Sequence, residues 1–164
     1  MAAGAPFGIT PYGTEAMHVL RAEKGYPIIG QETDGSVTPD DLGMGRMVSA
    51  KTWCIGSRSM RRSDTIRPDR KQLVGLLPVD PTDLLPEGAQ LVDAPDLAPP
   101  MPMQGHVTSS YRSDALGRTF ALALVRGGRA RVGDTIYAPL PDRTVAAVIT
   151  SSVLFDPENT RRDG

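Results

Sequence analysis

The stretch GHVTSSYRSDALGRTFALALV, residues 105–125, contains two candidate β-strands, GHVTSSY and FALALV, with turn-forming residues between them. From Arg70 onward the chain has four more short runs of this kind, KQLVGLLPV, AQLVD, DTIYAPL and TVAAVIT. Turn residues separate these runs, as in LPEG, where Pro86 and Gly88 suit a type I or II turn. The sequence therefore predicts an all-β unit of about six strands. A two-layer sandwich is the alternative, but we favour a small barrel because closure removes exposed sheet edges.

The chain before this unit has the signals of helices. In GTEAMHVLRAEKGY, residues 13–26, Thr14 is a candidate N-cap, Glu15 lies in the first turn, and Gly25 stands where helices commonly end. One helix is therefore expected here.

Further signals of this kind follow in the next forty residues. Thr38, Pro39 and Asp41 indicate the start of a second, short helix. The stretch RMVSAKTWCIG, residues 46–56, predicts a strand or extended piece that leads into a third helix around SRSMRRSD. We therefore expect an α+β chain, with a partial helix-rich domain over residues 1–67 and a small β-barrel domain over residues 68–164.

The charge balance and the hydropathy exclude several classes of partner. Eighteen basic and 19 acidic residues give a formal net charge of -1, which offers no general attraction for nucleic acid or an anionic membrane. No apolar run approaches the roughly 20 residues that a bilayer span requires. The start MAAGAPFGITPYG lacks the basic and apolar regions of a signal peptide, so we expect a cytoplasmic protein.

Residues that carry chemistry in other proteins are sparse. Cys54 is the single cysteine and stands between Trp53 and Ile55, so we expect a buried, inert thiol. The two histidines, His18 and His106, have no zinc-site spacing. The nucleotide loops GxxxxGK[ST] and GxGxxG and the hydrolase elbow GxSxG are absent, so we expect no independent catalysis.

Glu23 occupies an unusual position at the end of the first predicted helix. It follows Ala16, Val19 and Leu20 on one face, so a carboxylate continues the apolar stripe. A negative charge in the last turn opposes the helix dipole, at a cost of a few tenths to about 1 kcal/mol. Periodicity alone favours an exposed acid that pairs with a neighbouring lysine or arginine. The alternative is a carboxylate at the bottom of an apolar pocket that accepts two parallel hydrogen bonds from a flat ligand such as a pterin.

Four separated motifs resemble the glycine-cleavage T-protein (aminomethyltransferase) family. They are LRAEKGYPIIGQETDGSVTPDDLGM, IGSRSM, KQLVGL and GHVTSSYRSDALGRTFALALV, and they occur in the family's order. The resemblance extends from about Pro11 to Phe155 and concerns the carboxyl-terminal half of the family. Within it, PYGTEAMHVLRAEKGYPIIGQETDG is most similar to the branch found in α subunits of heterotetrameric sarcosine oxidases. Where many members have Ser-Pro, this chain has Ser113-Asp114, for which we expect little beyond a changed turn.

The resemblance implies a tetrahydrofolate-binding module in which Glu23 holds the pterin. It implies Tyr26 and Lys51 as further folate-binding residues. In the family, the catalytic aspartate lies on an earlier segment, so no catalytic residue and no metal ligand is expected here. The expected function is that of a carboxyl-terminal fragment of a sarcosine oxidase α subunit, inactive when isolated, which helps tetrahydrofolate capture the one-carbon unit released from sarcosine.

The same resemblance implies partners outside this chain. FAD, FMN and NAD are expected only in the complete heterotetramer, together with its other subunits and the upstream part of the α subunit. Two other interpretations stay open: a noncatalytic module for subunit docking, and a fragment of a T-protein-like aminomethyltransferase. An uncovered apolar helix face could also support self-association.

Overall fold

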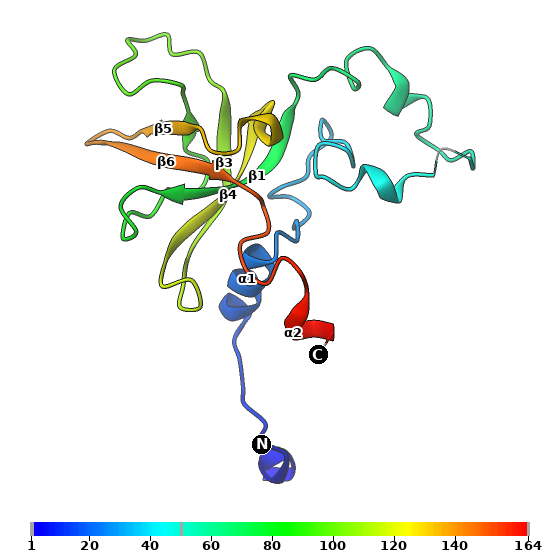
Figure 1. Ribbon diagram of the computed structural model, residues 1–164, viewed down its shortest axis with the longest axis vertical. Coiled ribbons are helices and arrows are strands. Elements are labelled where there is room, and N and C mark those ends of the chain that lie inside the picture. The colour runs from blue at the N-terminus through cyan, green and yellow to red at the C-terminus, as the bar shows by residue number, and fades with distance from the viewer. Residues whose placement is uncertain (1, 50, 164) are drawn as a thin grey trace.

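The structure is a computed structural model that describes residues 2–49 and 51–163. Its centre is one antiparallel sheet of six strands in the order β2-β3-β4-β1-β6-β5 (Figure 1). The strands are β1 (Lys71–Pro78), β2 (Gln90–Leu91), β3 (Gly105–Ser113), β4 (Arg118–Arg126), β5 (Thr135–Pro139) and β6 (Thr144–Thr150). Each of them falls on a run that the sequence predicts, so the six-stranded unit is confirmed.

The two edge strands of this sheet meet and close it into a barrel. Val92, directly after β2, donates its N–H to the carbonyl of Tyr137 in β5 at 2.8 Å, and the N–H of Tyr137 donates back at 3.0 Å. The alternative of an open two-layer sandwich is therefore wrong. Closure satisfies edge groups that would otherwise face water or another chain.

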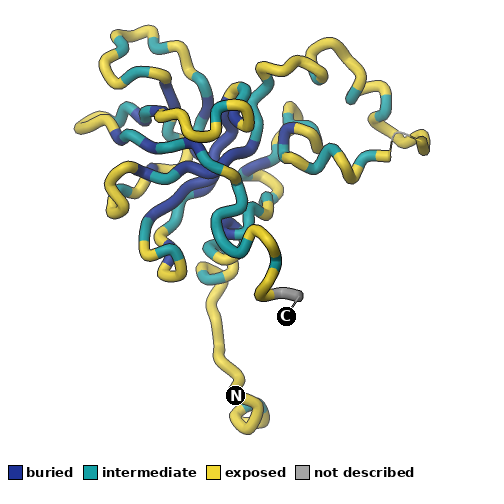
Figure 2. The backbone as a smooth tube through the Cα atoms, viewed as in Figure 1, coloured by how far each residue is buried: buried dark blue, intermediate teal, exposed yellow. Residues whose placement is uncertain are grey.

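The barrel has an apolar interior and a second apolar cluster on its outer face. The interior is built from side chains of β1 to β6 that include the fully buried Leu76, Ile136 and Ile149. Figure 2 shows buried stretches of backbone gathered at the centre of the barrel. The outer cluster consists of Ala22, Leu73, Phe120, Leu122 and Leu124. Since Ala22 belongs to the helix α1 (Thr14–Glu23), this cluster is what attaches the helix to the barrel.

Helix α1 ends in a Schellman motif. The N–H of Tyr26 donates to the carbonyl of Arg21 at 2.9 Å, and the N–H of Gly25 donates to that of Ala22 at 3.0 Å. Gly25 has φ +71°, and a Cβ there would lie 2.6 Å from the carbonyl oxygen of Ser152. The predicted helix end is confirmed. The predicted N-cap is wrong by one residue, because Gly13 occupies that position without a side-chain bond.

The segment between α1 and β1 contains less regular structure than the sequence predicts. The expected helix from Pro39 forms only turns, although Thr38 and Asp41 do make reciprocal bonds: the N–H of each donates to the other's side-chain oxygen, at 2.8 and 3.2 Å. No strand forms among residues 46–49 and 51–56, with residue 50 outside the described residues, although Val48 has an extended backbone. The expected third helix is a single 3₁₀ turn, η3 (Ser59–Arg61).

The remaining short helices are η1 (Ala2–Phe7), η2 (Gly45–Met47), η4 (Gly128–Arg131) and α2 (Thr160–Asp163). Figure 1 shows the segment that carries η2 and η3 extending away from the barrel, and most of it is exposed in Figure 2. The chain is thus mixed, with few helices and a barrel, as the α+β prediction requires. The boundary between residues 67 and 68 stays a prediction. In the part of the chain that the structure describes, no helix has the length and apolar character to cross a membrane.

Candidate functional site

The carboxylate of Glu23 is buried at the carboxyl end of α1. The residue is only 3% exposed, and its Oε1 accepts a hydrogen bond from the hydroxyl of Ser113 at 2.5 Å. The N–H of Leu116 in turn donates to that hydroxyl oxygen at 2.9 Å. No local pattern in the sequence connects Ser113 with Glu23, because the two residues lie 90 positions apart, so Ser113 was expected to do no more than change a turn.

No basic residue neutralises this carboxylate within the described residues. The two nearest cations along the chain are both engaged elsewhere: Arg21 pairs with Glu32 at 2.8 Å, and Lys24 pairs with Asp156 at 3.2 Å. The interpretation of Glu23 as an exposed acid in an ion pair is therefore wrong. A buried charge without a counter-ion is costly unless hydrogen bonds satisfy it. Ser113 supplies one such bond, and a carboxylate has about four acceptor positions.

Glu23 lines a hollow of about 420 Å³ with mostly apolar walls. The other lining residues are Tyr12, Met17, Leu20, Arg21, Lys24, Tyr26 and Phe155. Phe155 reaches this place because the carbonyl of Glu23 accepts the N–H groups of Leu154 and Phe155, at 2.9 and 3.0 Å. The chain after β6 is therefore fixed to the end of α1. A carboxylate that lines an apolar hollow can hold a flat ring that has N–H donors on one edge.

A buried polar network fixes α1 above strand β3. The guanidinium of Arg21 donates to Glu32 at 2.8 Å, to Gln31 at 2.7 Å and to the hydroxyl of Ser109 at 2.7 Å. Glu32 is 0% exposed and accepts from the hydroxyls of Thr108 at 3.0 Å and Ser109 at 2.5 Å. No local pattern in the sequence predicts this network, because Arg21 and Ser109 lie 88 positions apart.

Two domain descriptions match this chain. Residues 71–156 match the glycine cleavage T-protein C-terminal barrel domain, and residues 1–52 match the GCVT N-terminal domain. The chain belongs to the glycine cleavage T-protein family.

Relatives within the T-protein family include sarcosine oxidase subunits. The chain is 54% identical over 165 residues to the sarcosine oxidase subunit alpha of Corynebacterium sp. (strain P-1), covering 99% of the chain and 17% of that protein. It is 41% identical over 162 residues to the subunit alpha of Rhizobium meliloti (strain 1021), covering 97% of the chain and 16% of that protein. The chain thus spans about a sixth of the length of these curated relatives. The recognised resemblance is confirmed.

A solved structure supports the T-protein fold independently. The crystal structure of the glycine cleavage system aminomethyltransferase T from Bartonella henselae superposes with a TM-score of 0.73. The match covers 88% of this chain and 39% of that one, at 22% identity. At this identity the likeness concerns the fold alone.

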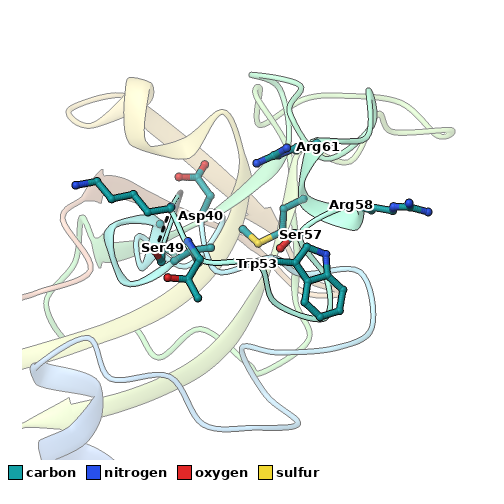
Figure 3. A pocket seen from close by; sticks show the side chains of 11 residues that line it. Asp40, Ser49, Trp53, Ser57, Arg58 and Arg61 are labelled. Atoms are coloured by element: carbon teal, nitrogen blue, oxygen red, sulfur yellow. Dashed lines mark hydrogen bonds between the residues drawn. The ribbon is translucent and has the colours of Figure 1, made fainter.

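The three residues that the T-protein resemblance implies as folate-binding lie in two different hollows. Tyr26 is 54% exposed and lines the same hollow as Glu23. Lys51 lines a different hollow of about 700 Å³, together with Trp53, Arg58 and others (Figure 3). The structure therefore brings Tyr26 to Glu23 and leaves Lys51 elsewhere. A role for any of them in folate binding stays a prediction.

Cys54 differs from its expected environment. The residue is exposed, and its Sγ lies 3.3 Å from the hydroxyl of Ser57. The prediction of a buried thiol is wrong because the segment around Trp53 does not pack on the barrel, and Trp53 itself is 77% exposed. The described residues contain no group of three or more His, Cys, Asp or Glu side chains that could hold a metal ion.

Proposed function

We propose that this chain forms part of a tetrahydrofolate site in a sarcosine oxidase α subunit, with Glu23 as the anchor for the pterin. The observation that carries the proposal is the buried carboxylate of Glu23, which has no cationic partner among the described residues and lines an apolar hollow. The 54% identity to a sarcosine oxidase subunit alpha supports the assignment to this branch of the family.

The residues present fit a pterin ring. Glu23 offers carboxylate oxygens to adjacent N–H donors on one ring edge, and the described residues donate only the bond from Ser113 to this side chain. The ring would have apolar contacts with Leu20, Tyr26 and Phe155, which all line the hollow. Lys51 cannot contribute to the same hollow in this arrangement.

The proposed role of this chain is to bind and orient. Bound tetrahydrofolate supplies the nitrogens N5 and N10, which take up the one-carbon unit released when sarcosine is oxidatively demethylated. We place the oxidation at a flavin on a partner subunit, and the FAD, FMN and NAD sites outside these residues. Orientation of a reacting group supplies a large part of many rate enhancements. The isolated chain is therefore expected to be inactive.

A titration tests the role of Glu23. The full-length polypeptide is titrated with tetrahydrofolate by calorimetry in the absence of oxygen, beside Glu23→Gln. Loss of charge-assisted hydrogen bonds worth about 1.5–3 kcal/mol should weaken binding roughly tenfold to a hundredfold. Glu15→Gln is the matched control, because Glu15 is an exposed acid on the same helix. Equal affinity of the Glu23→Gln variant and the unmodified protein would remove the assignment.

Subunit docking is a second candidate function. It is favoured by the exposed apolar side chains on the segment that extends from the barrel, with Met47 79%, Trp53 77% and Ile55 93% exposed. Trp and Met are enriched in protein interfaces. Co-purification of the chain with sarcosine oxidase subunits, equal with and without folate and reduced in Trp53→Ser, would support docking. Failure of the chain to associate with any of these subunits would contradict it.

A further inference from the structure

A third hollow, of about 250 Å³, lies on the outer face of the barrel. Its position follows from the sheet register: Leu73 on β1 pairs with Leu124 on β4, and both belong to the outer apolar cluster. Val37 also packs on this cluster, so the loop before β1 lies over the same face. Its charged and titratable lining includes Asp34, Asp41, Asp69, Lys71, His106 and Arg126. None of them lines the hollow of Glu23.

Two cations lie directly opposite one another in this hollow. Lys71 pairs with Arg126 in the register of β1 and β4, so the two side chains point to the same face of the sheet. Side chains at such positions have Cβ atoms about 4.5–5.5 Å apart, and like charges there are destabilising. The arrangement therefore has an unfavourable energy that an anion between the two side chains would reverse.

The acids of the hollow do not neutralise these two cations. Asp41 accepts hydrogen bonds from Arg70 at 3.0 and 2.7 Å, and Asp69 pairs with Arg67 at 3.0 Å. Burial alone would raise the pKa of Asp41, but the hydrogen bonds from Arg70 and Thr38 outweigh it and lower the pKa.

The third acid, Asp34, has neutral hydrogen-bond donors and keeps its charge, which acts on His106. Asp34 accepts the hydroxyl and the N–H of Ser36 at 2.6 and 2.7 Å. Within the described residues, neither Lys71 nor Arg126 has a carboxylate at salt-bridge distance. The hollow therefore has two cations available for a ligand.

His106 adds a third donor on the same face. It pairs with Leu124 on β4, two residues from Arg126, so its side chain points the same way. Burial lowers the pKa of His106, the charge of Lys71 lowers it further, and Asp34 raises it. An anion beside the ring would favour its protonated form.

We propose that Lys71, Arg126 and His106 bind a small oxyanion, a phosphate or carboxylate group, in this hollow. Arg126 suits such a ligand because a guanidinium can donate two parallel bonds to two oxygens, and Lys71 adds a point charge. The hollow is smaller than the roughly 300–1,000 Å³ of pockets for drug-sized molecules, so the bound part is a single group. The proposal does not depend on the folate site.

The test uses the ring signals of the two histidines in an NMR titration of the 164-residue chain. Inorganic phosphate and, in a separate arm, succinate are added at constant ionic strength maintained with NaCl. The expected result is a saturable shift of the His106 signals and a rise of its pKa, with little change at His18 on α1. Saturation by both anions identifies a general oxyanion site. Saturation by only one of them shows whether the site accepts a phosphate or a carboxylate group. Shifts no larger than those from NaCl would overturn the proposal.

Variants assign the effect to the two cations. Lys71→Met and Arg126→Met should each weaken binding by about tenfold or more, as expected for a charge-assisted bond. Arg112→Met is the matched control, because Arg112 is an exposed arginine on β3 that lines none of these hollows. Without an anion, Lys71→Met should raise the melting temperature, and phosphate should stabilise the unmodified chain more than this variant. Binding by both variants as tight as that of the unmodified chain would exclude the site.

Discussion

Replacing Arg21 with methionine should destabilise the fold far more than removal of a surface cation. Glu32 would remain 0% exposed and would lose its salt bridge of 2.8 Å. Removing one partner of a buried ion pair costs about 3–5 kcal/mol. Glu32 would keep hydrogen bonds from Thr108 at 3.0 Å, from Ser109 at 2.5 Å and from the N–H of Ile28 at 2.8 Å. We therefore expect the lower end of this range, about 3 kcal/mol.

Two further variants test whether the uncompensated charge of Glu32 causes the destabilisation. Arg131→Met removes pairs with Asp93 at 2.7 Å and with Asp134 at 3.4 Å. Both carboxylates are more than half exposed, so the variant should lower the free energy of unfolding by about 1 kcal/mol or less. The double variant Arg21→Met with Glu32→Met removes both buried charges. It should be less destabilised than Arg21→Met alone, because no uncompensated carboxylate remains in the interior.

The free energy of unfolding is measured by urea denaturation, followed by far-ultraviolet circular dichroism and extrapolated linearly to water. If Arg21→Met lowers the free energy of unfolding no more than Arg131→Met does, the structural role of the Arg21–Glu32 network is refuted. A double variant at least as unstable as Arg21→Met would refute the argument from an uncompensated charge.

Three other predictions test the local structure. Gly25→Ala should lower the free energy of unfolding by at least about 2 kcal/mol, because alanine is unfavourable in the left-handed conformation and its Cβ would lie 2.6 Å from the carbonyl oxygen of Ser152. Gly35→Ala is the control in the same urea assay, because a Cβ at Gly35 has no atom within 4 Å. The folded pKa of Asp41 lies below 3.8, so its contribution to stability is present above that pH and is lost as the pH falls through the folded value. Asp41→Asn should therefore flatten the dependence of the unfolding free energy on pH below about 4, and an unchanged slope would count against the ion pair. Cys54 is exposed, so a thiol reagent should label it in the native chain as completely as in urea, whereas protection until unfolding would contradict the structure.

The sequence by itself determined the local elements of this protein. The six strands could be predicted because each is a short apolar run bounded by turn residues, and these signals require no distant contact. The end of α1 could be predicted for the same reason, since Gly25 supplies the left-handed conformation that a Schellman motif needs. The unusual position of Glu23 on an apolar face was also visible from periodicity.

Tertiary contacts decided the rest. Closure of the barrel depends on two bonds between Val92 and Tyr137, which lie 45 residues apart in sequence and carry no local signal of their pairing. The burial of Glu23 depends on Ser113, and that of Glu32 on Thr108 and on Ser109. Helix signals after Thr38 failed, because caps that satisfy one turn supply too little energy to extend a helix without an apolar face to pack. A carboxylate looks the same in a sequence whether it faces water or an apolar hollow, and only the packing around it separates the two.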